Sequence, residues 1–177
     1  MTLIKRAKSQ PEAFIQLYDA YVERIYQYLL RRLGQPEVAE DLSSQVWEKV
    51  LKKISSLRSD EELGFASWLF TIARNELNQY FRRHKKEEVY ALPEILEDES
   101  KGPGDLTRET SNVEVIRQIL VVLPKKQREV VEFRYFADLQ NKEIAKILKV
   151  SEKTVASNLS RGLKTLHERL SAIGDFS

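Results

Sequence analysis

Apolar residues recur at steps of three and four along almost the whole chain outside residues 87–110. In the segments 14–29, 38–51 and 65–81, this spacing places the large side chains on one face of a helix. No segment shows the strict alternation of apolar and polar residues that is typical of a half-buried strand. The pattern therefore predicts an all-α fold.

Residues that favour helix ends mark the expected boundaries. Ser9 is expected to cap the first long helix, Gly34 to end it and Pro36 to open the next one. In the C-terminal half, Asn141 and Ser151 are expected to cap a short helix and a long last helix. Together these signals predict two small helical bundles.

Residues 87–110 separate the two bundles. They contain two prolines and two glycines and are rich in acidic residues, which predicts a flexible acidic linker. Residues 1–86 contain 15 Lys and Arg against 11 Asp and Glu, residues 113–177 contain 12 against 8, and residues 87–112 contain 2 against 8. Two basic blocks joined by an acidic connector suggest modules that face a polyanion, although ordinary surface charge gives the same pattern.

Several classes of function are excluded or disfavoured by composition. The chain contains no cysteine and only two histidines, His84 and His167, so we expect no disulfide, no thiolate metal site and no Ser-His-Asp triad. No Gly-rich phosphate loop or metal-ligand cluster appears, which predicts a non-enzymatic protein without a cofactor or small-molecule substrate. The longest apolar runs are too short to cross a bilayer, and the N-terminus lacks the apolar core of a signal peptide. We therefore expect a cytoplasmic protein without direct membrane insertion.

Residues 141–166, NKEIAKILKVSEKTVASNLSRGLKTL, have the spacing of a helix-turn-helix. Ile144, Ala145 and Leu148 are expected to face inward, Val150 to fill the turn, and Val155 and Leu159 to anchor the second helix. Ser151 at the cap leaves the first turns of that helix free to face DNA bases. The alternative is an ordinary helical hairpin within a core.

Two blocks of sequence resemble a known family. Residues 123–166, LPKKQREVVEFRYFADLQNKEIAKILKVSEKTVASNLSRGLKTL, resemble region 4 of sigma factors, in which an LPxxxREV start precedes the helix-turn-helix. The segments EVAEDLSSQVWEKVLKKI and FASWLFTIARNELNQYFRR resemble region 2 of the same family. The blocks occur in the expected order, without a region 1 extension or a separate region 3 domain. The chain thus resembles the extracytoplasmic-function (ECF) class of the sigma-70 family.

The resemblance implies a domain organisation and a function. Residues 1–86 would form a region 2-like domain, residues 87–110 the linker, and residues 111–177 a region 4-like domain. The protein would be an alternative sigma factor that binds core RNA polymerase and directs promoter-specific transcription initiation, with an anti-sigma protein as a further partner. A linker of 24 residues stretches to at most about 80–85 Å. The linker can therefore span two promoter elements about two helical turns, or ~70 Å, apart only if it is well extended.

The resemblance also implies three sets of contact residues. Region 4 would read the −35 duplex through Lys142, Ser151, Lys153, Thr154, Ser157, Asn158, Arg161 and Lys164. Region 2 would bind the −10 element and the melted strand through the polar face of residues 65–86, namely Arg74, Asn75, Asn78, Gln79, Arg82 and Arg83. The clamp helices of the largest polymerase subunit would contact Asp41, Gln45, Glu48, Lys49 and Lys52. The helix REVVEFRYF would seat region 4 on the flap of the other large subunit.

Some positions depart from the pattern of the family. Lys149 stands where relatives usually carry glycine in the helix-turn-helix turn, and a left-handed backbone there would cost about 1–2 kcal/mol. Ala156 and Asn158 replace basic residues, which predicts a weaker hold on phosphates and a different promoter preference. Ser44 and Gln79 also differ from the usual residues of region 2.

Three other functions compete with this interpretation. An autonomous helix-turn-helix regulator with a helical dimerisation domain is disfavoured by the basic polar face at 74–86, because a dimerisation surface should be more apolar. An enzyme acting on nucleic acid lacks candidate catalytic groups. An adaptor that binds polymerase without reading DNA would be indifferent to substitution of Arg161 and Lys164.

Overall fold

The computed structural model describes residues 2–58, 61–84 and 120–173, and within these ranges helices are the only regular elements. The all-α prediction is thus confirmed for the described chain. The elements are α1 (Leu3–Ala7), α2 (Pro11–Leu33), α3 (Pro36–Lys53), a 3-10 turn (Ile54–Ser56), α4 (Glu62–Arg83), α7 (Lys125–Tyr135), α8 (Asn141–Leu148) and α9 (Glu152–Ile173). The linker predicted at 87–110 lies outside the described residues.

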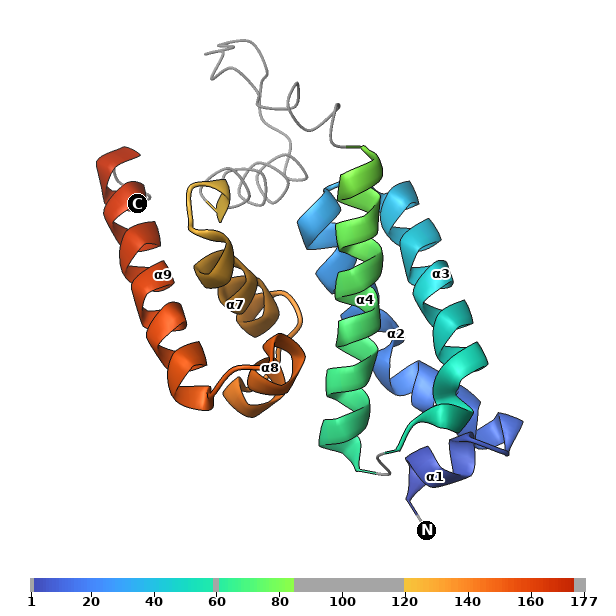
Figure 1. Ribbon diagram of the computed structural model, residues 1–177. Coiled ribbons are helices and arrows are strands. Elements are labelled where there is room, and N and C mark those ends of the chain that lie inside the picture. Colours follow the sequence, from blue (N-terminus) through green and yellow to red (C-terminus); the bar gives the residue numbers. More distant parts are fainter. Residues whose placement is uncertain (1, 59–60, 85–119, 174–177) are drawn as a thin grey trace.

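The N-terminal bundle consists of α2, α3 and α4 packed side by side, with α1 at one end (Figure 1). Gly34 ends α2 with a left-handed backbone (φ 71°), and its N–H bonds to the carbonyl of Leu30 at 2.7 Å. Pro36 then opens α3 at the first helical position, as predicted, because proline lacks the N–H that would be unsatisfied there. The resulting tight turn makes α2 and α3 neighbours.

The start of the chain differs from the prediction. Thr2 caps the short helix α1, which the sequence pattern did not predict, and its hydroxyl accepts a hydrogen bond from the N–H of Lys5. Pro11 takes the first position of α2, so Gln10 is the N-cap residue and the predicted cap at Ser9 is wrong. The fixed backbone of proline decides this boundary more strongly than the hydroxyl of Ser9.

The C-terminal bundle contains the predicted helix-turn-helix. Ser151 caps α9, since its Oγ accepts a hydrogen bond from the N–H of Thr154 at 3.1 Å. The cap of α8 is Gln140 rather than Asn141, and its N–H donates to the Glu143 carboxylate at 2.7 Å. Lys149 has the left-handed backbone (φ 55°, ψ 47°) that its place in the turn required.

The core of the helix-turn-helix is largely as expected, with one correction. Ile144 and Val155 are fully buried and Ala145 is nearly so, whereas Leu148 is only half-buried. Val150 does not fill the turn, because its side chain is 40% exposed. Ile147, which the sequence analysis did not assign to this core, is buried.

The two bundles pack against each other within the described chain. Helix α8 contacts α4, and α7 contacts α2. One continuous apolar core includes Ile25 and Phe70 from the N-terminal bundle and Phe133 and Ile144 from the C-terminal one. In Figure 1, α7 and α8 accordingly lie on the side of α9 that faces α4.

Candidate nucleic-acid interface

Helix α9 presents most of the residues predicted for the −35 element on its exposed side. Val155 anchors the helix in the core, and Gly162 lies against α7, where an added Cβ would come within 3.0 Å of Val131. Exposed side chains occupy the remaining surface of the helix and of the first turn of α8: Lys142, Lys153, Thr154, Ser157, Arg161 and Lys164. This surface combines cations that suit phosphates with hydroxyl groups that suit base edges.

Three residues of this set, Ser151, Thr154 and Asn158, are hydrogen-bonded to one another at the start of α9. The Ser151 hydroxyl is engaged in the cap and lies 2.8 Å from the Thr154 hydroxyl. The half-buried Asn158 donates its side-chain amide to the Thr154 carbonyl at 2.9 Å. Lys164 lies 3.9 Å from Glu168 in an exposed pair, which is too weak to hold it away from a phosphate.

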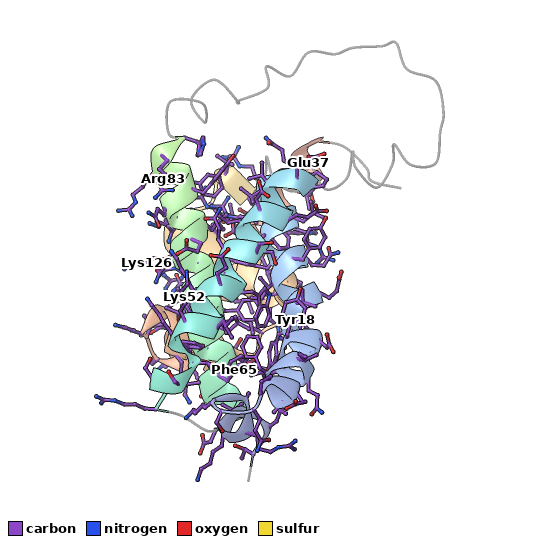
Figure 2. The ribbon with its side chains drawn as sticks, turned by 90° about the vertical axis from the view of Figure 1, so that its right-hand side faces the viewer. Tyr18, Glu37, Lys52, Phe65, Arg83 and Lys126 are labelled. Atoms are coloured by element: carbon purple, nitrogen blue, oxygen red, sulfur yellow. The ribbon has the colours of Figure 1, made fainter. Side chains whose placement is uncertain are left out.

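The polar residues predicted for the −10 element form a stripe along α4. Asn75, Arg82 and Arg83 are exposed, whereas Arg74, Asn78 and Gln79 are half-buried. Among the apolar residues of the same segment, Phe65, Leu69 and Phe70 are fully buried, whereas the remaining large ones are half-buried, namely Trp68, Ile72, Tyr80 and Phe81. Figure 2 shows Phe65 inside the bundle and Arg83 at its edge. The expected apolar face is confirmed at Phe65 and Leu69, whereas the DNA contacts assigned to the polar face stay a prediction.

Arg74 is held by the C-terminal bundle. Its guanidinium contacts the Glu129 carboxylate of α7, with Nη2 and Nε at 2.7 and 2.9 Å from Oε1. A groove of about 590 Å³ lies here between α4 and α7. Its walls include the predicted −10 residues of α4 and charged residues of α7, namely Arg74, Asn75, Asn78, Gln79, Arg82, Lys125, Arg128, Glu129 and Glu132.

The residues predicted to bind polymerase share the outer face of α3. Asp41, Gln45, Glu48 and Lys52 are exposed on it. Lys49 is half-buried and donates a 2.6 Å hydrogen bond to Glu76, a buried carboxylate of α4, so it ties the two helices together. Glu76 is only 7% exposed and supplies a buried charge partner that the sequence pattern did not identify.

The structure adds an apolar surface beside this face. Leu51, which the periodicity assigned to the buried side of its helix, is 61% exposed. Ile15 and Tyr18 of α2 are also exposed, and the Tyr18 ring packs against Trp47 with centroids 4.7 Å apart. Tyr18 and Lys52 both lie at the surface in Figure 2. No feature of the sequence distinguished Leu51 from the core residues. Periodicity shows which residues share a helix face, but it does not show whether another element covers that face.

A second set of charges missed by the sequence analysis lies between α2 and α7. Glu132 of α7 is only 3% exposed, and its Oε2 lies 3.0 Å from Nε of Arg32. Burial raises the pKa of Glu132 above its ordinary value, while the nearby Arg32 and Arg128 oppose the rise. Burial also raises the pKa of Tyr28, whose ring stacks on Phe133 with centroids 5.4 Å apart.

The fold and this surface define a two-bundle helix-turn-helix protein with basic faces on α4 and α9. Family models for sigma-70 region 2 and sigma-70 region 4 match residues 17–87 and 114–166. The chain is 31% identical over 160 residues to RNA polymerase sigma factor YlaC of Bacillus subtilis, covering 87% of this chain and 90% of that one.

Further comparisons agree with these matches. ECF RNA polymerase sigma factor BldN of Streptomyces coelicolor is 28% identical over 169 residues, which are 94% of this chain and 64% of that one. The solved structure of CnrH in complex with the cytosolic domain of CnrY has the same fold, with a TM-score of 0.72, 22% identity and 96% of each chain covered. The chain belongs to the ECF class of the sigma-70 family of RNA polymerase sigma factors. Its function is promoter-specific transcription initiation.

Proposed function

We propose that the two basic faces divide promoter recognition between them. Helix α9 would enter the major groove of the −35 element, and the polar stripe of α4 would hold the −10 element and its melted strand. The observation that carries this proposal is the surface of α9, where Lys153, Thr154 and Ser157 are exposed in the first turns after a capped N-terminus. A helix-turn-helix places this part of its second helix against base edges.

The protein makes this contribution as a subunit of RNA polymerase rather than as an enzyme, and it works in the cytoplasm. The exposed residues of α3, from Asp41 to Lys52, would contact the clamp helices of the largest subunit. Helix α7 would seat region 4 on the flap of the other large subunit. An anti-sigma protein would restrain the chain, by analogy with CnrH, which was solved with the cytosolic domain of CnrY.

Reconstitution with bacterial core polymerase tests the division of labour. The holoenzyme is assayed by transcription from a genomic promoter library, which identifies the −35 and −10 sequences used. Thr154→Ala and Ser157→Ala should relax the preference at particular −35 bases, since a good base contact contributes roughly 1–3 kcal/mol of discrimination. Lys153→Ala should weaken all promoters alike, because phosphate contacts carry no sequence information.

Ser160→Ala provides the matched control, because this exposed residue lies on α9 outside the predicted set. Unchanged −35 preferences in both Thr154→Ala and Ser157→Ala would show that α9 does not read the bases. If no promoter-specific initiation and no complex with core polymerase were observed, the assignment of polymerase and promoter contacts would fail altogether.

The anti-sigma partner needs a separate measurement. A tagged chain is purified from the cells that make it, and the mass of the native complex is determined. A stoichiometric protein that blocks initiation by the reconstituted holoenzyme, and whose removal restores it, would support the proposal. A chain recovered alone and fully active would contradict it.

A further inference from the structure

Helix α8 carries lysines on the face opposite its core. Lys142, Lys146 and Lys149 stand at i, i+4 and i+7, so they fall within about 60° of one another around a helix of 3.6 residues per turn. All three are exposed, whereas Ile144 and Ile147 on the other side are buried. We call these three residues the lysine stripe. Only Lys142 belongs to the surface assigned above to the −35 element, so Lys146 and Lys149 have no role yet.

The charge of the lysine stripe is not neutralised within the described chain. No ion pair of its three ammonium groups occurs among the described residues. The Glu143 carboxylate accepts the N–H of Gln140 at 2.7 Å in the cap of α8. Glu152 lies in the first turn of α9, where the helix dipole favours an anion. The lysine stripe therefore presents unpaired positive charge, which suits a polyanion.

The backbone at Lys149 argues against a lysine stripe that is only solvated surface. Its left-handed conformation (φ 55°) is one that glycine adopts without strain. A cation near a helix C-terminus gains from the dipole, but this gain is smaller than the cost of a left-handed backbone with a side chain. Residues held in such sparsely populated conformations occur preferentially at functional sites. A ligand that binds the Lys149 ammonium group would offset the cost.

The first turns of α9 contribute little positive charge by comparison. Residues 152–159 contain one lysine and one glutamate. The side-chain amide of Asn158 donates to a carbonyl of the same helix. Residues 141–149, in contrast, contain three lysines and one glutamate. Positive charge in the helix-turn-helix is therefore concentrated on α8 and the turn, rather than on the helix that would read the bases.

We propose that Lys146 and Lys149 extend the surface of Lys142 into a phosphate-binding strip, which holds the DNA backbone at the edge of the −35 element. The inference rests on the proposed function of α9 and adds residues that supply affinity to it. In a helix-turn-helix, the first helix crosses the backbone while the second lies in the major groove. Phosphate contacts carry no sequence information, so the lysine stripe strengthens binding and leaves the choice of bases to α9.

The dimensions of the lysine stripe fit one DNA strand. Seven residues of helix separate its two ends, which is about 10 Å at a rise of 1.5 Å per residue. One strand presents a phosphate about every 3.4 Å along the duplex axis, so each of the three lysines can meet its own phosphate. Helices α8 and α9 pack against each other, as Figure 1 shows, which fixes the position of the lysine stripe relative to α9.

The salt dependence of DNA binding by the reconstituted holoenzyme measures these contacts. The dissociation constant for a fluorescent promoter duplex is determined from about 50 to about 200 mM KCl. Each lost phosphate contact reduces the slope of log Kobs against log salt concentration by about 0.9. Lys146→Gln and Lys149→Gln should each show this reduction. The fourfold rise in salt should then weaken binding by each variant about 3.5-fold less than binding by the unsubstituted holoenzyme.

Two further substitutions separate the charge of Lys149 from its backbone strain. Lys149→Arg keeps the charge and should keep the slope. Lys149→Gly removes both the charge and the strain, so it should bind with the reduced slope of Lys149→Gln although its fold becomes more stable.

Arg169→Gln is the matched control. It removes one positive charge from an exposed position of α9, about 24 Å along the helix axis from Lys153, and it should leave the slope unchanged. Circular dichroism verifies that each variant stays helical.

Unchanged slopes in Lys146→Gln and Lys149→Gln would overturn the inference. A loss of core polymerase binding in these variants without a change in slope would also overturn it, because the lysine stripe would then serve a protein partner. The slopes can be measured on a duplex of any sequence. A holoenzyme that shows the expected slopes but no preference among −35 sequences would instead count against the proposed function of α9 and leave the lysine stripe intact.

Discussion

The backbone at Lys149 contains a local strain that glycine would relieve. This residue ends α8 in the left-handed conformation (φ 55°), which costs a residue with a side chain about 1–2 kcal/mol relative to glycine. Lys149→Gly should therefore raise the free energy of unfolding by about 1 kcal/mol in urea denaturation. Lys146→Gly, at an exposed position inside α8, should lower it by about 1 kcal/mol. Equal effects of the two substitutions would show that the turn is not strained.

Residues on opposite faces of α4 should respond differently to truncation. Leu69 is fully buried, so Leu69→Ala should lower the free energy of unfolding by about 2–5 kcal/mol. Asn75 is exposed, and Asn75→Ala should change stability by less than about 0.5 kcal/mol while slowing promoter opening. Urea denaturation and permanganate footprinting of the melted strand measure the two quantities. Normal opening by Asn75→Ala would remove this residue from the −10 surface.

The raised pKa of Glu132 predicts a pH-dependent stability. Arg32, Arg128, Glu129 and Tyr28 are the charged or titratable groups nearby, and burial outweighs the two arginines in raising the pKa above 4.5. A carboxyl with a raised folded-state pKa stabilises the fold fully below its unfolded pKa, and this contribution is lost as the pH rises through the folded-state pKa.

Glu132→Gln removes this titration, because the amide stays neutral. Urea midpoints measured from about pH 4 to about pH 7 should therefore fall less steeply with rising pH in the variant than in the unsubstituted chain. Parallel pH profiles for the two proteins would show that Glu132 titrates alike in the folded and unfolded chain.

At the scale of elements, the recognition helix depends on its cap. The Ser151 hydroxyl satisfies the N–H of Thr154, so Ser151→Ala should lower the free energy of unfolding by about 1 kcal/mol. Ser160→Ala, in an exposed position further along α9, should be neutral or slightly stabilising, because alanine has the higher helix propensity. Urea denaturation compares the two variants. A loss of the same size in both would mean that the cap contributes nothing specific.

The helices could be predicted from sequence because their signals are local. Gly34, Pro36 and Ser151 each act within a few residues, and the apolar period of α2, α3 and α4 identifies their buried faces. The exposure of Leu51 and Val150 could not be predicted, since it depends on whether another element covers them. The cap at Gln10 was missed because Pro11 overrides the hydroxyl of Ser9.

The predicted site residues follow the same division between local and long-range effects. The exposed surface of α9 could be predicted, because it depends only on the helical period of the apolar residues and on the cap at Ser151. Arg74 and Lys49 were predicted as free contact residues, but each has a carboxylate partner from another helix, Glu129 and Glu76 respectively. The Glu129 partner is 55 residues from Arg74 along the chain, and such pairing follows only from the docking of the two bundles.

At the scale of the whole molecule, the shared core predicts how the chain unfolds. One apolar core runs from Ile25 of α2 to Phe133 of α7, so neither bundle loses its packing independently. Calorimetry should record a single transition, in which the calorimetric and van't Hoff enthalpies agree.

Arg24 of α2 donates from Nη2 to the carbonyls of Ala137 and Asp138, which follow α7. The same measurement on Arg32→Gln combined with Arg24→Gln should resolve two transitions, because the bundles then separate before either one melts. Lys5→Gln should keep the single transition, since its exposed position lies outside the interface. Two transitions in the unsubstituted chain would mean that the contact between α2 and α7 is too weak to couple the bundles. In that case the Arg32–Glu132 pair would orient the bundles without coupling their unfolding.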